Sequence, residues 1–338
     1  MSRERMKRLN APIEKMLSRE DARLLEAAWQ AARENHGDTF SFYLPGMIRY
    51  GRQRGRYPAV SITGNHCALL CEHCKSKLLE PMIKVQSPEA LLQVAQKFVR
   101  NGAHGMLLTG GADRNGRLPW ERYYPSIEKI GRQSALYLSA HTGFPGRETC
   151  RLLRKAGLKQ ALIDVMGDEK AARQVYHLPG LHTVLMALEA IQESGIELVP
   201  HIVAGLHYGN IDAEYEALKL IQRFQPSALV FVVLTPLKGT PMAEISPPSP
   251  LEIARLIAGA RLLMPEIPIS LGCERPRDRR GWVMERLAIR AGATRMAVWS
   301  DDALDECKKL GLRPRFQATC CSLEFRPEFG FGHSLNVR

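Results

Sequence analysis

The sequence lacks any long apolar run. Its 338 residues contain no stretch of about 18 consecutive apolar positions, the length that a helix needs to cross a bilayer. The N-terminus is basic, but no apolar stretch follows it, so it does not resemble a secretory signal. A hydrophobic content of 45% and a charged content of 24% are typical of a soluble globular chain. We therefore expect a cytoplasmic protein with no membrane partner.

Cysteine is also scarce. Eight cysteines in a chain of this length do not suggest a disulfide scaffold, and in a reducing compartment clustered cysteines more often bind metal or perform chemistry. A recognisable nucleic-acid-binding module is missing as well, although the net charge is +12. A basic surface attracts acidic partners. Two interpretations of the charge stay open, a solvated surface and an acidic macromolecular substrate, and no nucleic-acid partner is expected.

What the sequence does contain is a repeating rhythm of strands and helices. Short apolar runs rich in β-branched residues alternate with amphipathic helical stretches, some opened by a capping box such as Ser249-Pro250-Leu251-Glu252. Continuous apolar runs are typical of parallel strands buried on both faces. Eight such units predict an α/β protein with a (β/α)8 barrel of the TIM type. The predicted strands lie at Ala59–Ile62, Gly105–Thr109, Ala135–Ser139, Ala161–Met166, Glu197–Val203, Ala228–Leu234, Ile267–Leu271 and Arg295–Trp299.

The barrel is predicted to occupy residues 53–303. An N-terminal extension, residues 1–52, is expected to be helical because Leu9, Ile13, Met16 and Leu17 recur at helical spacing. Residues 304–338 form a C-terminal tail. In a barrel of this type the chemistry lies on the loops that follow the C-terminal ends of the strands, so motifs at those positions are the candidates for function.

The clearest motif is a cysteine triplet directly after the first predicted strand. Cys67, Cys71 and Cys74 have C-x3-C-x2-C spacing. Three thiolates can bind three irons of a cubane and leave the fourth iron open to a small molecule, whereas an ordinary electron-transfer cluster has four cysteines. The alternatives are a zinc site, which usually has a second ligand pair, and a conventional cluster with a distant fourth ligand. The sequence offers no clean second pair.

The segment from Ser61 through Cys74 resembles the radical S-adenosylmethionine superfamily, and the resemblance extends over about residues 55–303. It implies a radical SAM barrel with a [4Fe–4S] cluster on Cys67, Cys71 and Cys74. The open iron of that cluster would chelate S-adenosylmethionine. Reduction would then give a 5′-deoxyadenosyl radical that takes hydrogen from an unactivated carbon.

The resemblance also implies residues that contact S-adenosylmethionine. Gly110-Gly111, at the end of the second predicted strand, resembles the GGE motif of the family, with Ala112 in place of the glutamate. Asp164 stands where family members often bind the ribose hydroxyls, although a strand-end cap is the alternative. His201 and Gly205 match a GxIxG-type adenine-binding turn, with His201 in place of the first glycine.

A second cysteine group lies later in the chain. Cys273 follows the seventh predicted strand, and Cys320 and Cys321 lie in the tail. If the tail folds over the barrel mouth, these residues would hold an auxiliary iron–sulfur cluster whose fourth ligand is not evident. The alternative is that they are buried apolar residues, as free cysteines commonly are. Cys150 and Cys307, both in predicted helices, are expected to be of that buried kind.

Several segments are similar to the biotin synthase and lipoyl synthase side of the superfamily, including His141-Thr142-Gly143 and residues 200–207. The segment Leu271–Arg277 is most similar to the archaeal-type, two-protein lipoyl synthases. Single-protein lipoyl synthases have an additional N-terminal cysteine triplet, and this chain has no cysteine before Cys67. The resemblance implies sulfur insertion, in which a carbon radical on an octanoyl chain attacks a sulfide of the auxiliary cluster.

The same resemblance implies partners. These are an octanoylated lipoyl carrier domain, an electron donor such as ferredoxin or flavodoxin, and a partner radical SAM subunit. Carrier domains of this kind are typically acidic, so a basic enzyme surface would favour the encounter. The competing hypotheses are a biotin synthase-like enzyme, another radical enzyme without sulfur insertion (a mutase, lyase or methylase), and a non-catalytic iron–sulfur or zinc protein.

Histidines and arginines near predicted strand ends are further candidates. A histidine there could serve the site or simply satisfy hydrogen bonds; the candidates are His141, His201 and His207. The arginines after the seventh predicted strand could bind a carboxylate or the carrier, or could form a solvated loop; they are Arg275, Arg277, Arg279 and Arg280.

Overall fold

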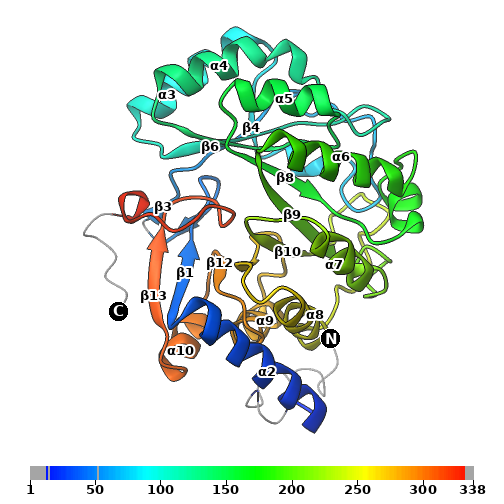
Figure 1. The fold of residues 1–338 in the computed structure, drawn as a ribbon, viewed down its shortest axis with the longest axis vertical. Helices are drawn as coiled ribbons and strands as arrows, with labels where there is room; N and C mark the ends of the chain where they lie inside the picture. The colour runs from blue at the N-terminus through cyan, green and yellow to red at the C-terminus, as the bar shows by residue number, and fades with distance from the viewer. Residues whose placement is uncertain (1–12, 14–15, 52, 332–338) are drawn as a thin grey trace.

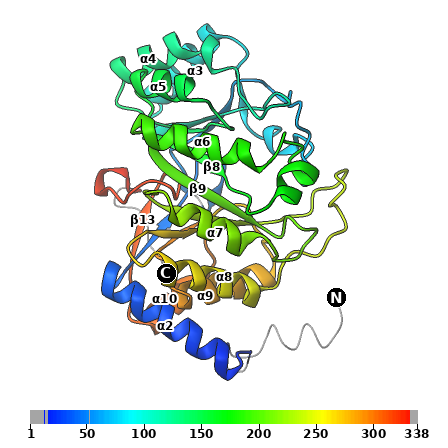
Figure 2. The same cartoon turned by 45° about the vertical axis from the view of Figure 1, so that its right-hand side comes forward.

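A computed structural model describes residues 13, 16–51 and 53–331. Within these ranges the centre of the molecule is an 11-stranded sheet whose neighbouring strands are all parallel, in the order β13-β1-β12-β11-β10-β9-β8-β7-β6-β4-β5. The sheet curves, with the helices on its outer side (Figures 1 and 2). Its strands are β1 (Thr39–Tyr43), β4 (Ala59–Ser61), β5 (Ile83–Lys84), β6 (Gly105–Thr109), β7 (Tyr137–His141), β8 (Gln160–Asp164), β9 (Glu197–Ala204), β10 (Leu229–Val233), β11 (Ile269–Leu271), β12 (Arg295–Ala297) and β13 (Arg313–Gln317).

Helices connect successive strands and cover the sheet. Several begin at the predicted caps: Ser249 and Glu252 form the capping box of α8, and Ser87 caps α3 ahead of a proline. None of the described helices is long and apolar enough to cross a bilayer. The helices are α2 (Arg19–His36), α3 (Pro88–Arg100), α4 (Tyr124–Gln133), α5 (Arg147–Lys155), α6 (Leu181–Ser194), α7 (Glu214–Gln222), α8 (Pro250–Leu263), α9 (Arg279–Arg290) and α10 (Asp301–Lys309).

The prediction of a TIM-type α/β fold is confirmed, but the strand count of eight is wrong. All eight predicted strands are present as β4 and β6 to β12. In the sheet, the structure adds three strands to these eight: β1, from the extension expected to be helical, β13, from the tail, and β5, which pairs with β4. β1 and β13 pair with each other, and β1 also pairs with β12. In the described residues β13 and β5 are the two edges of the sheet, so it forms an incomplete barrel. The sequence analysis did not predict β1 because Pro45-Gly46 interrupts the pattern there. In the structure this Pro-Gly pair lies just beyond the end of the short strand.

The helical part of the extension is anchored to the barrel by a salt bridge. Ser18 caps α2 in a capping box with Asp21. Asp21 also accepts hydrogen bonds of 2.6 and 3.0 Å from Arg255 of α8, and this guanidinium lowers the pKa of Asp21 to about 2. Of the earlier apolar positions, Ile13 is buried, while Leu9 lies outside the described residues.

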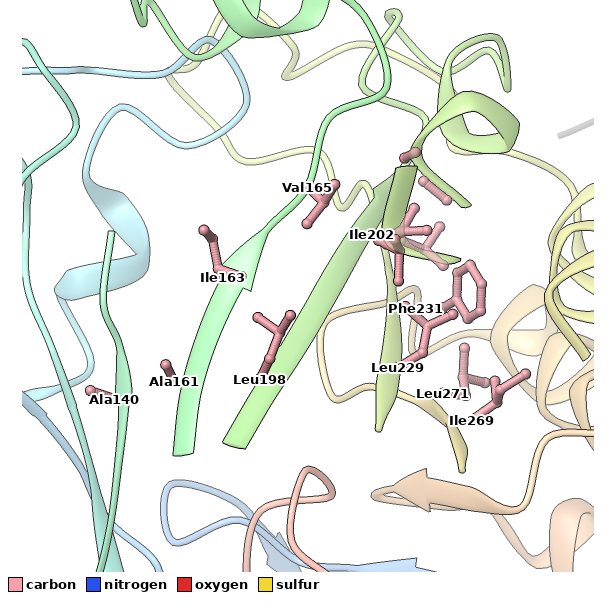
Figure 3. Packing of buried hydrophobic residues seen from close by; sticks show 14 of the residues in the cluster. Ala140, Ala161, Ile163, Val165, Leu198, Ile202, Leu229, Phe231, Ile269 and Leu271 are labelled. Atoms are coloured by element: carbon pink, nitrogen blue, oxygen red, sulfur yellow. The ribbon is translucent and has the colours of Figure 1, made fainter. Parts of the chain in front are cut away.

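The strands divide their side chains between two cores. Alternate residues, such as Ile163 of β8 and Phe231 of β10, pack on the outer face against the helices (Figure 3). The residues between them point into the barrel and form a smaller apolar cluster. That inner cluster consists of Tyr43, Leu162, Val199, Ala228, Val230, Ala297 and Cys321, with Leu107, Val232, Cys273 and Cys320 packed against it. The inner face of the sheet therefore already holds three of the predicted site residues.

The C-terminal tail enters the barrel instead of covering its mouth. After β13, the carbonyl oxygen of Ser322 accepts hydrogen bonds from Gln160 (3.2 Å) and Arg295 (3.3 Å). Gln160 and Arg295 are the first residues of β8 and β12, so the tail comes in at the end where the strands begin. The auxiliary cluster was predicted on the condition that the tail folds over the barrel mouth, and the structure does not meet that condition. Parallel pairing with β1 ends β13 beside Tyr43, and the residues after Gln317 then turn back to reach Gln160 and Arg295.

Candidate metal centre

The cysteine triplet lies in a loop that follows β4 and is held from two sides. Cys71 is buried at 5% exposure, and Cys67 and Cys74 are partly exposed. On one side, the Ala68 amide donates to the carbonyl of Ala112, just after β6, at 2.7 Å. On the other side, the amide of Glu72 donates to the carbonyl of Val175, after β8, at 2.9 Å. The loop is thus fixed at the mouth of the barrel by its neighbours.

The thiols of this loop interact with one another. A hydrogen bond from Cys71 lowers the pKa of Cys74 to about 4, and the ring of His73 contributes to this lowering. The same hydrogen bond, together with burial, raises the pKa of Cys71 well above its usual range. Since the thiolate is the form that binds metal, Cys74 is ready to ligate at neutral pH.

The loop suits a cluster better than a single ion. Among the described residues, no three His, Cys, Asp or Glu side chains converge as a single metal ion requires. A structural zinc ion needs four ligands within about 2.0–2.3 Å of one point. A cubane instead offers a separate iron to each thiolate, which fits three cysteines spread along one loop. The spacing of the triplet therefore matches a cluster, and zinc stays the alternative.

The glycine pair after β6 is needed to make room for this loop. A Cβ on Gly111 would lie 1.9 Å from the carbonyl oxygen of His66 and 2.5 Å from the Cα of Cys67. The amide of Gly111 donates to the hydroxyl of Thr63 at 2.6 Å, and a Cβ on Gly110 would also press on Thr63. Gly110 and Gly111 thus have a packing role beside the cysteine loop. Their contact with S-adenosylmethionine stays a prediction.

Asp164 is linked to the cysteine loop through a tyrosine. The Tyr176 hydroxyl donates to Asp164 at 3.0 Å, and the rings of Tyr176 and His73 lie 5.0 Å apart. The carbonyl oxygen of Tyr176 is 3.6 Å from the Sγ of Cys71. Asp164 therefore lies at the mouth next to the triplet, and its carboxylate accepts from the side chain of Tyr176.

Two of the candidate histidines form a pair inside the barrel. The rings of His141 and His201 lie 4.8 Å apart, edge to face. Burial lowers the pKa of both, most strongly that of His201, so both are neutral at pH 7. His207 is placed elsewhere: its Nε2 lies 3.0 Å from Asp168. The structure thus brings together two of the three histidines.

Gly205 has a structural role of its own. Its φ is +95°, and its amide donates to Glu214 at 2.7 Å. A Cβ there would lie 2.7 Å from Pro248. These contacts explain why a glycine follows β9 without any ligand. Whether Gly205 and His201 contact the adenine stays a prediction.

The second cysteine group is assembled inside the barrel. Cys321 hydrogen-bonds to Cys320 and lowers the pKa of Cys320 to about 6. Burial, with the nearby charge of Cys320, raises the pKa of Cys273 to about 11. The three thiols are therefore neighbours although the sequence separates them widely. By contrast, Cys150 and Cys307 are buried in α5 and α10, where burial raises the pKa of each to about 12, as expected for apolar residues.

Unpartnered polar atoms surround this second group. Among the described residues, the hydroxyls of Tyr43, Ser270 and Ser322 and the Oε1 of Gln160 are buried without a hydrogen-bond partner. An unsatisfied buried polar group costs about 1–3 kcal/mol. Ser270 lies beside Cys321 and Ser322 beside Cys320. The three hydroxyls beside the thiols can donate hydrogen bonds, and an iron–sulfur cluster fits there because its sulfur atoms accept them.

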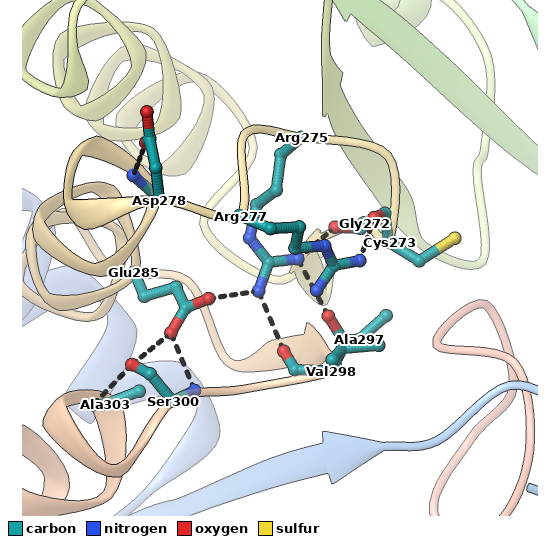
Figure 4. A network of polar contacts seen from close by, with 11 residues as sticks. Gly272, Cys273, Arg275, Arg277, Asp278, Glu285, Ala297, Val298, Ser300 and Ala303 are labelled. Carbon is teal, nitrogen blue, oxygen red and sulfur yellow. Dashed lines mark hydrogen bonds and ion pairs between the residues drawn. The ribbon is translucent and has the colours of Figure 1, made fainter. Parts of the chain in front are cut away.

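Sequence reasoning missed Tyr43 and Ser270. A signal for Ser270 was present: a polar residue stands in the middle of the strand Ile269–Leu271, which is otherwise apolar. For Tyr43 no such signal existed because its strand was not expected. Arg275 was interpreted wrongly. It is buried at 2% exposure and bonds only to neighbouring parts of the barrel (Figure 4), so it binds no external carboxylate and belongs to no solvated loop.

Comparison with known families agrees with the cysteine loop and the barrel. The model of the Radical SAM superfamily matches residues 61–221, and that of the Biotin and Thiamin Synthesis associated domain matches residues 231–319. The chain belongs to the radical SAM superfamily. Membership implies a [4Fe–4S] cluster and S-adenosylmethionine as cofactors. The second matched region contains Cys273 and β13.

Curated relatives of this radical SAM protein are biotin synthases. That of Zymomonas mobilis is 27% identical over 224 residues, which cover 64% of this chain and 66% of the relative. That of Rhodopseudomonas palustris (strain TIE-1) is 26% identical over 269 residues, 74% of this chain and 78% of the relative. The chain thus spans just under two thirds of the Zymomonas enzyme. These relatives confirm the biotin synthase-like side of the superfamily, while the lipoyl synthase resemblance stays a prediction.

Solved structures agree on the fold. Methylornithine synthase (PylB) superposes with a TM-score of 0.63 at 16% identity and covers 92% of each chain. HydG, a maturase of the [FeFe]-hydrogenase, superposes with a TM-score of 0.63 at 14% identity, over 91% of this chain and 70% of HydG. At such low identity the likeness concerns the architecture alone.

Proposed function

We propose that this radical SAM protein inserts sulfur into an unactivated C–H bond. Cys67, Cys71 and Cys74 would hold the [4Fe–4S] cluster at the mouth, and Cys273 with the Cys320-Cys321 pair would hold an auxiliary cluster in the interior. The observation that supports sulfur insertion is the second cysteine group, which lies among buried polar atoms inside the same barrel. A radical enzyme that only rearranges or cleaves its substrate has no need of a second group there.

The protein residues have separate tasks in this proposal. When reduced, the first cluster supplies the electron that cleaves S-adenosylmethionine to the 5′-deoxyadenosyl radical. Asp164, held by Tyr176, is proposed to bind the ribose hydroxyls at the mouth. The neutral His141–His201 pair lines the interior near Asp164 and would exclude charge from the path of the radical.

The stoichiometry of sulfur insertion determines how much S-adenosylmethionine and how many electrons the reaction needs. Each C–H bond that is replaced uses one S-adenosylmethionine and one electron from an external donor. Methionine would be released and the hydrogen would leave in 5′-deoxyadenosine. The carbon radical would form a bond to a sulfide of the auxiliary group, and an iron of that group would take up the remaining electron as its bond to this sulfur breaks. A ferredoxin or flavodoxin is the proposed electron donor.

The interior suits an aliphatic substrate. Leu107 and Val232 are only partly buried where they border the inner cluster beside Cys273 and Cys320. Apolar walls favour a hydrocarbon chain because they remove its surface from water. Our preferred substrate is an octanoyl chain on an acidic lipoyl carrier domain, supported by the Leu271–Arg277 segment and by the net charge of +12, with a second radical SAM subunit as partner. The biotin synthase relatives support a biotin synthase-like substrate as the second candidate.

Iron and acid-labile sulfide content after anaerobic reconstitution tests the proposal. Three proteins are compared: the wild type, a Cys67→Ala, Cys71→Ala, Cys74→Ala variant, and a Cys273→Ala, Cys320→Ala, Cys321→Ala variant. We expect about eight irons in the wild type and about four in each variant if both clusters are cubanes. About four irons in the wild type, with none left in the first variant, would remove the sulfur donor and turn the search to rearrangement or methylation.

The substrate is tested with the reconstituted wild type. An octanoylated carrier domain and a dethiobiotin-type small molecule are each incubated with S-adenosylmethionine and a reductant, and the products are analysed by mass spectrometry. A mass increase from sulfur on the carrier supports the lipoyl synthase assignment. Sulfur on the small molecule alone supports the biotin synthase-like one, and cleavage of S-adenosylmethionine without sulfur in either product contradicts both.

A further inference from the structure

A buried arginine joins four parts of the barrel directly beside Cys273 (Figure 4). Arg275 donates from Nη1 to the carbonyls of Gly272 and Ala297, and from Nη2 to the carbonyl of Val298 at 2.8 Å and to Glu285 at 2.6 Å. Its charge is neutralised by Glu285, which is itself buried. One planar guanidinium thus satisfies four acceptors, an arrangement that a lysine cannot reproduce.

The network continues from Glu285 to the next helix. The second oxygen of Glu285 accepts hydrogen bonds from the amide and the hydroxyl of Ser300, at 2.9 and 2.5 Å, and Ser300 caps α10. Arg275 therefore ties the end of β11 to the end of β12, to α9 and to the start of α10. In Figure 4 the side chain of Cys273 points away from this network, which leaves its thiol free to face the interior.

The backbone around Cys273 is fixed on both sides by these contacts. Gly272 donates its amide to Phe231 of β10 at 2.7 Å, while its carbonyl accepts from Arg275. On the other side of Cys273, the carbonyl of Glu274 accepts from the amide of Val233 at 2.9 Å. Arg277 also donates to the carbonyl of Cys273 itself. The backbone of Cys273 is consequently held in place, and its thiol lies near Cys320 and Cys321.

A backbone outlier lies in the same network. Val298 has a φ of +55°, which is rare for a β-branched residue. Its amide donates to Tyr43 at 2.7 Å and its carbonyl accepts from Arg275. Strained residues of this kind persist only where the surroundings fix them, and they tend to occur at functional sites. Here the strained residue connects Arg275 to the backbone carbonyl of Tyr43, the residue whose side chain lies near Cys321.

We infer that Arg275 is a positioning residue for the auxiliary cluster: it fixes Cys273, through Gly272, in the orientation that lets its thiol share a cluster with Cys320 and Cys321. This inference rests on the proposed function. A general role in stability would change only the folding of the chain. A positioning role also requires that substitution of Arg275 change the properties of the auxiliary cluster. Outer-shell residues that orient metal ligands typically change metal affinity about 10- to 100-fold.

The chain offers a matched control in Arg261. This arginine is also fully buried, at 0% exposure, and donates to the carbonyls of Gly292 (3.0 Å), Pro265 (2.6 Å) and Ile267 (2.9 Å). Ile267 lies just before β11, so Arg261 holds the start of the strand whose end Arg275 holds. Substituting either residue disturbs a buried hydrogen-bond network of similar size, but only one network adjoins Cys273.

The experiment uses the full chain with Cys67→Ala, Cys71→Ala and Cys74→Ala, so that only the auxiliary cluster can form. Into this background we introduce Arg275→Lys or Arg261→Lys. Because Arg275→Lys leaves Glu285 poorly paired, a second variant, Arg275→Met with Glu285→Gln, removes both charges together. Circular dichroism reports folding. Iron content, the electron paramagnetic resonance spectrum of the reduced cluster and the rate of iron loss to a chelator report the cluster.

We expect each Arg275 variant to lose iron about 10-fold faster than the background, the lower end of typical outer-shell effects, with changed resonance positions. Arg261→Lys should lower the thermal midpoint but keep the spectrum of the background. Folded Arg275 variants with the spectrum and iron retention of the background would overturn the inference and leave the proposed function intact. A background that holds no iron at all would instead refute the auxiliary cluster, and with it both proposals.

Discussion

The two cysteine groups of this protein are built in opposite ways. Cys67, Cys71 and Cys74 lie within one loop, after one strand, and neighbouring elements only hold that loop in place. Cys273 and the Cys320-Cys321 pair come from segments that meet only because β13 pairs with β1 and sends the tail into the barrel. In each group one thiol hydrogen-bonds to another and lowers its pKa, to about 4 for Cys74 and about 6 for Cys320.

The difference shows what each group depends on. A local loop keeps its spacing whenever the loop forms, so the first group tolerates distant changes. The second group exists only in the complete fold, and its surroundings include buried hydroxyls that lack partners. Changes far from both groups should therefore affect the second group more than the first.

The largest effect is expected from the loss of one cysteine of the first group, Cys71. Cys71→Ala should abolish reductive cleavage of S-adenosylmethionine, because two thiolates cannot hold the site-differentiated cluster, while about four irons remain in the second group. Formation of 5′-deoxyadenosine is measured by chromatography. Cys150→Ala, which removes another buried cysteine, should keep full cleavage. Equal loss in both variants would show that folding, and not ligation, was affected.

The reverse substitution should separate cleavage from sulfur transfer. Cys321→Ala is expected to retain most cleavage of S-adenosylmethionine but to lose the sulfur-containing product, since the auxiliary group would lack a ligand. The ratio of product to 5′-deoxyadenosine measures this, with Cys307→Ala as the matched buried cysteine. If the ratio is unchanged in Cys321→Ala, the sulfur does not come from this group.

A smaller effect is expected for Ser270→Ala, which should stabilise the cofactor-free protein but weaken the auxiliary cluster in the reconstituted protein. Ser270→Ala removes a buried hydroxyl that has no partner among the described residues, so it should raise the free energy of unfolding of the cofactor-free protein by up to about 1 kcal/mol. In the reconstituted protein it should instead speed the loss of the auxiliary cluster. Ser139→Ala is the control, because its hydroxyl already bonds to Tyr57 at 2.7 Å and its loss should destabilise both states.

The smallest effect is expected for Asp21→Asn, which should lower the free energy of unfolding but leave both cysteine groups unchanged. Arg255 depresses the pKa of Asp21 to about 2, from 3.8. The stabilisation is therefore fully present above pH 3.8 and is lost as the pH falls toward 2. Since Arg255 is partly exposed, Asp21→Asn should cost about 1–2 kcal/mol of unfolding free energy at pH 7, and much less near pH 2.

Urea unfolding of the cofactor-free protein at the two pH values measures this last effect. Iron content at pH 7 should match the wild type. A change in either cluster would show that the N-terminal helix reaches the metal sites, which its contacts with α8 do not predict.

The sequence by itself determined the parts whose signals are local. Seven of the eight apolar runs contain β-branched residues, and the alternation of all eight with capped helices indicates a parallel barrel. The cysteine triplet is readable because its ligands lie within eight consecutive positions, 67–74. Even the grouping of Cys273 with Cys320 and Cys321 followed from their type and number.

Tertiary structure alone decided how the barrel is completed and where the second group lies. β1 and β13 are short and have weak local signals, but each becomes a strand because the other supplies hydrogen bonds along its length, across more than 250 positions of sequence. That pairing joins the tail to the barrel, and the chain after it turns back beside the first residues of β8 and β12. Cys320 and Cys321 thereby come near Tyr43 and Ser270. Long-range pairing depends on contacts that no local pattern encodes, which is why the sequence indicated the cysteines and only the fold could indicate their surroundings.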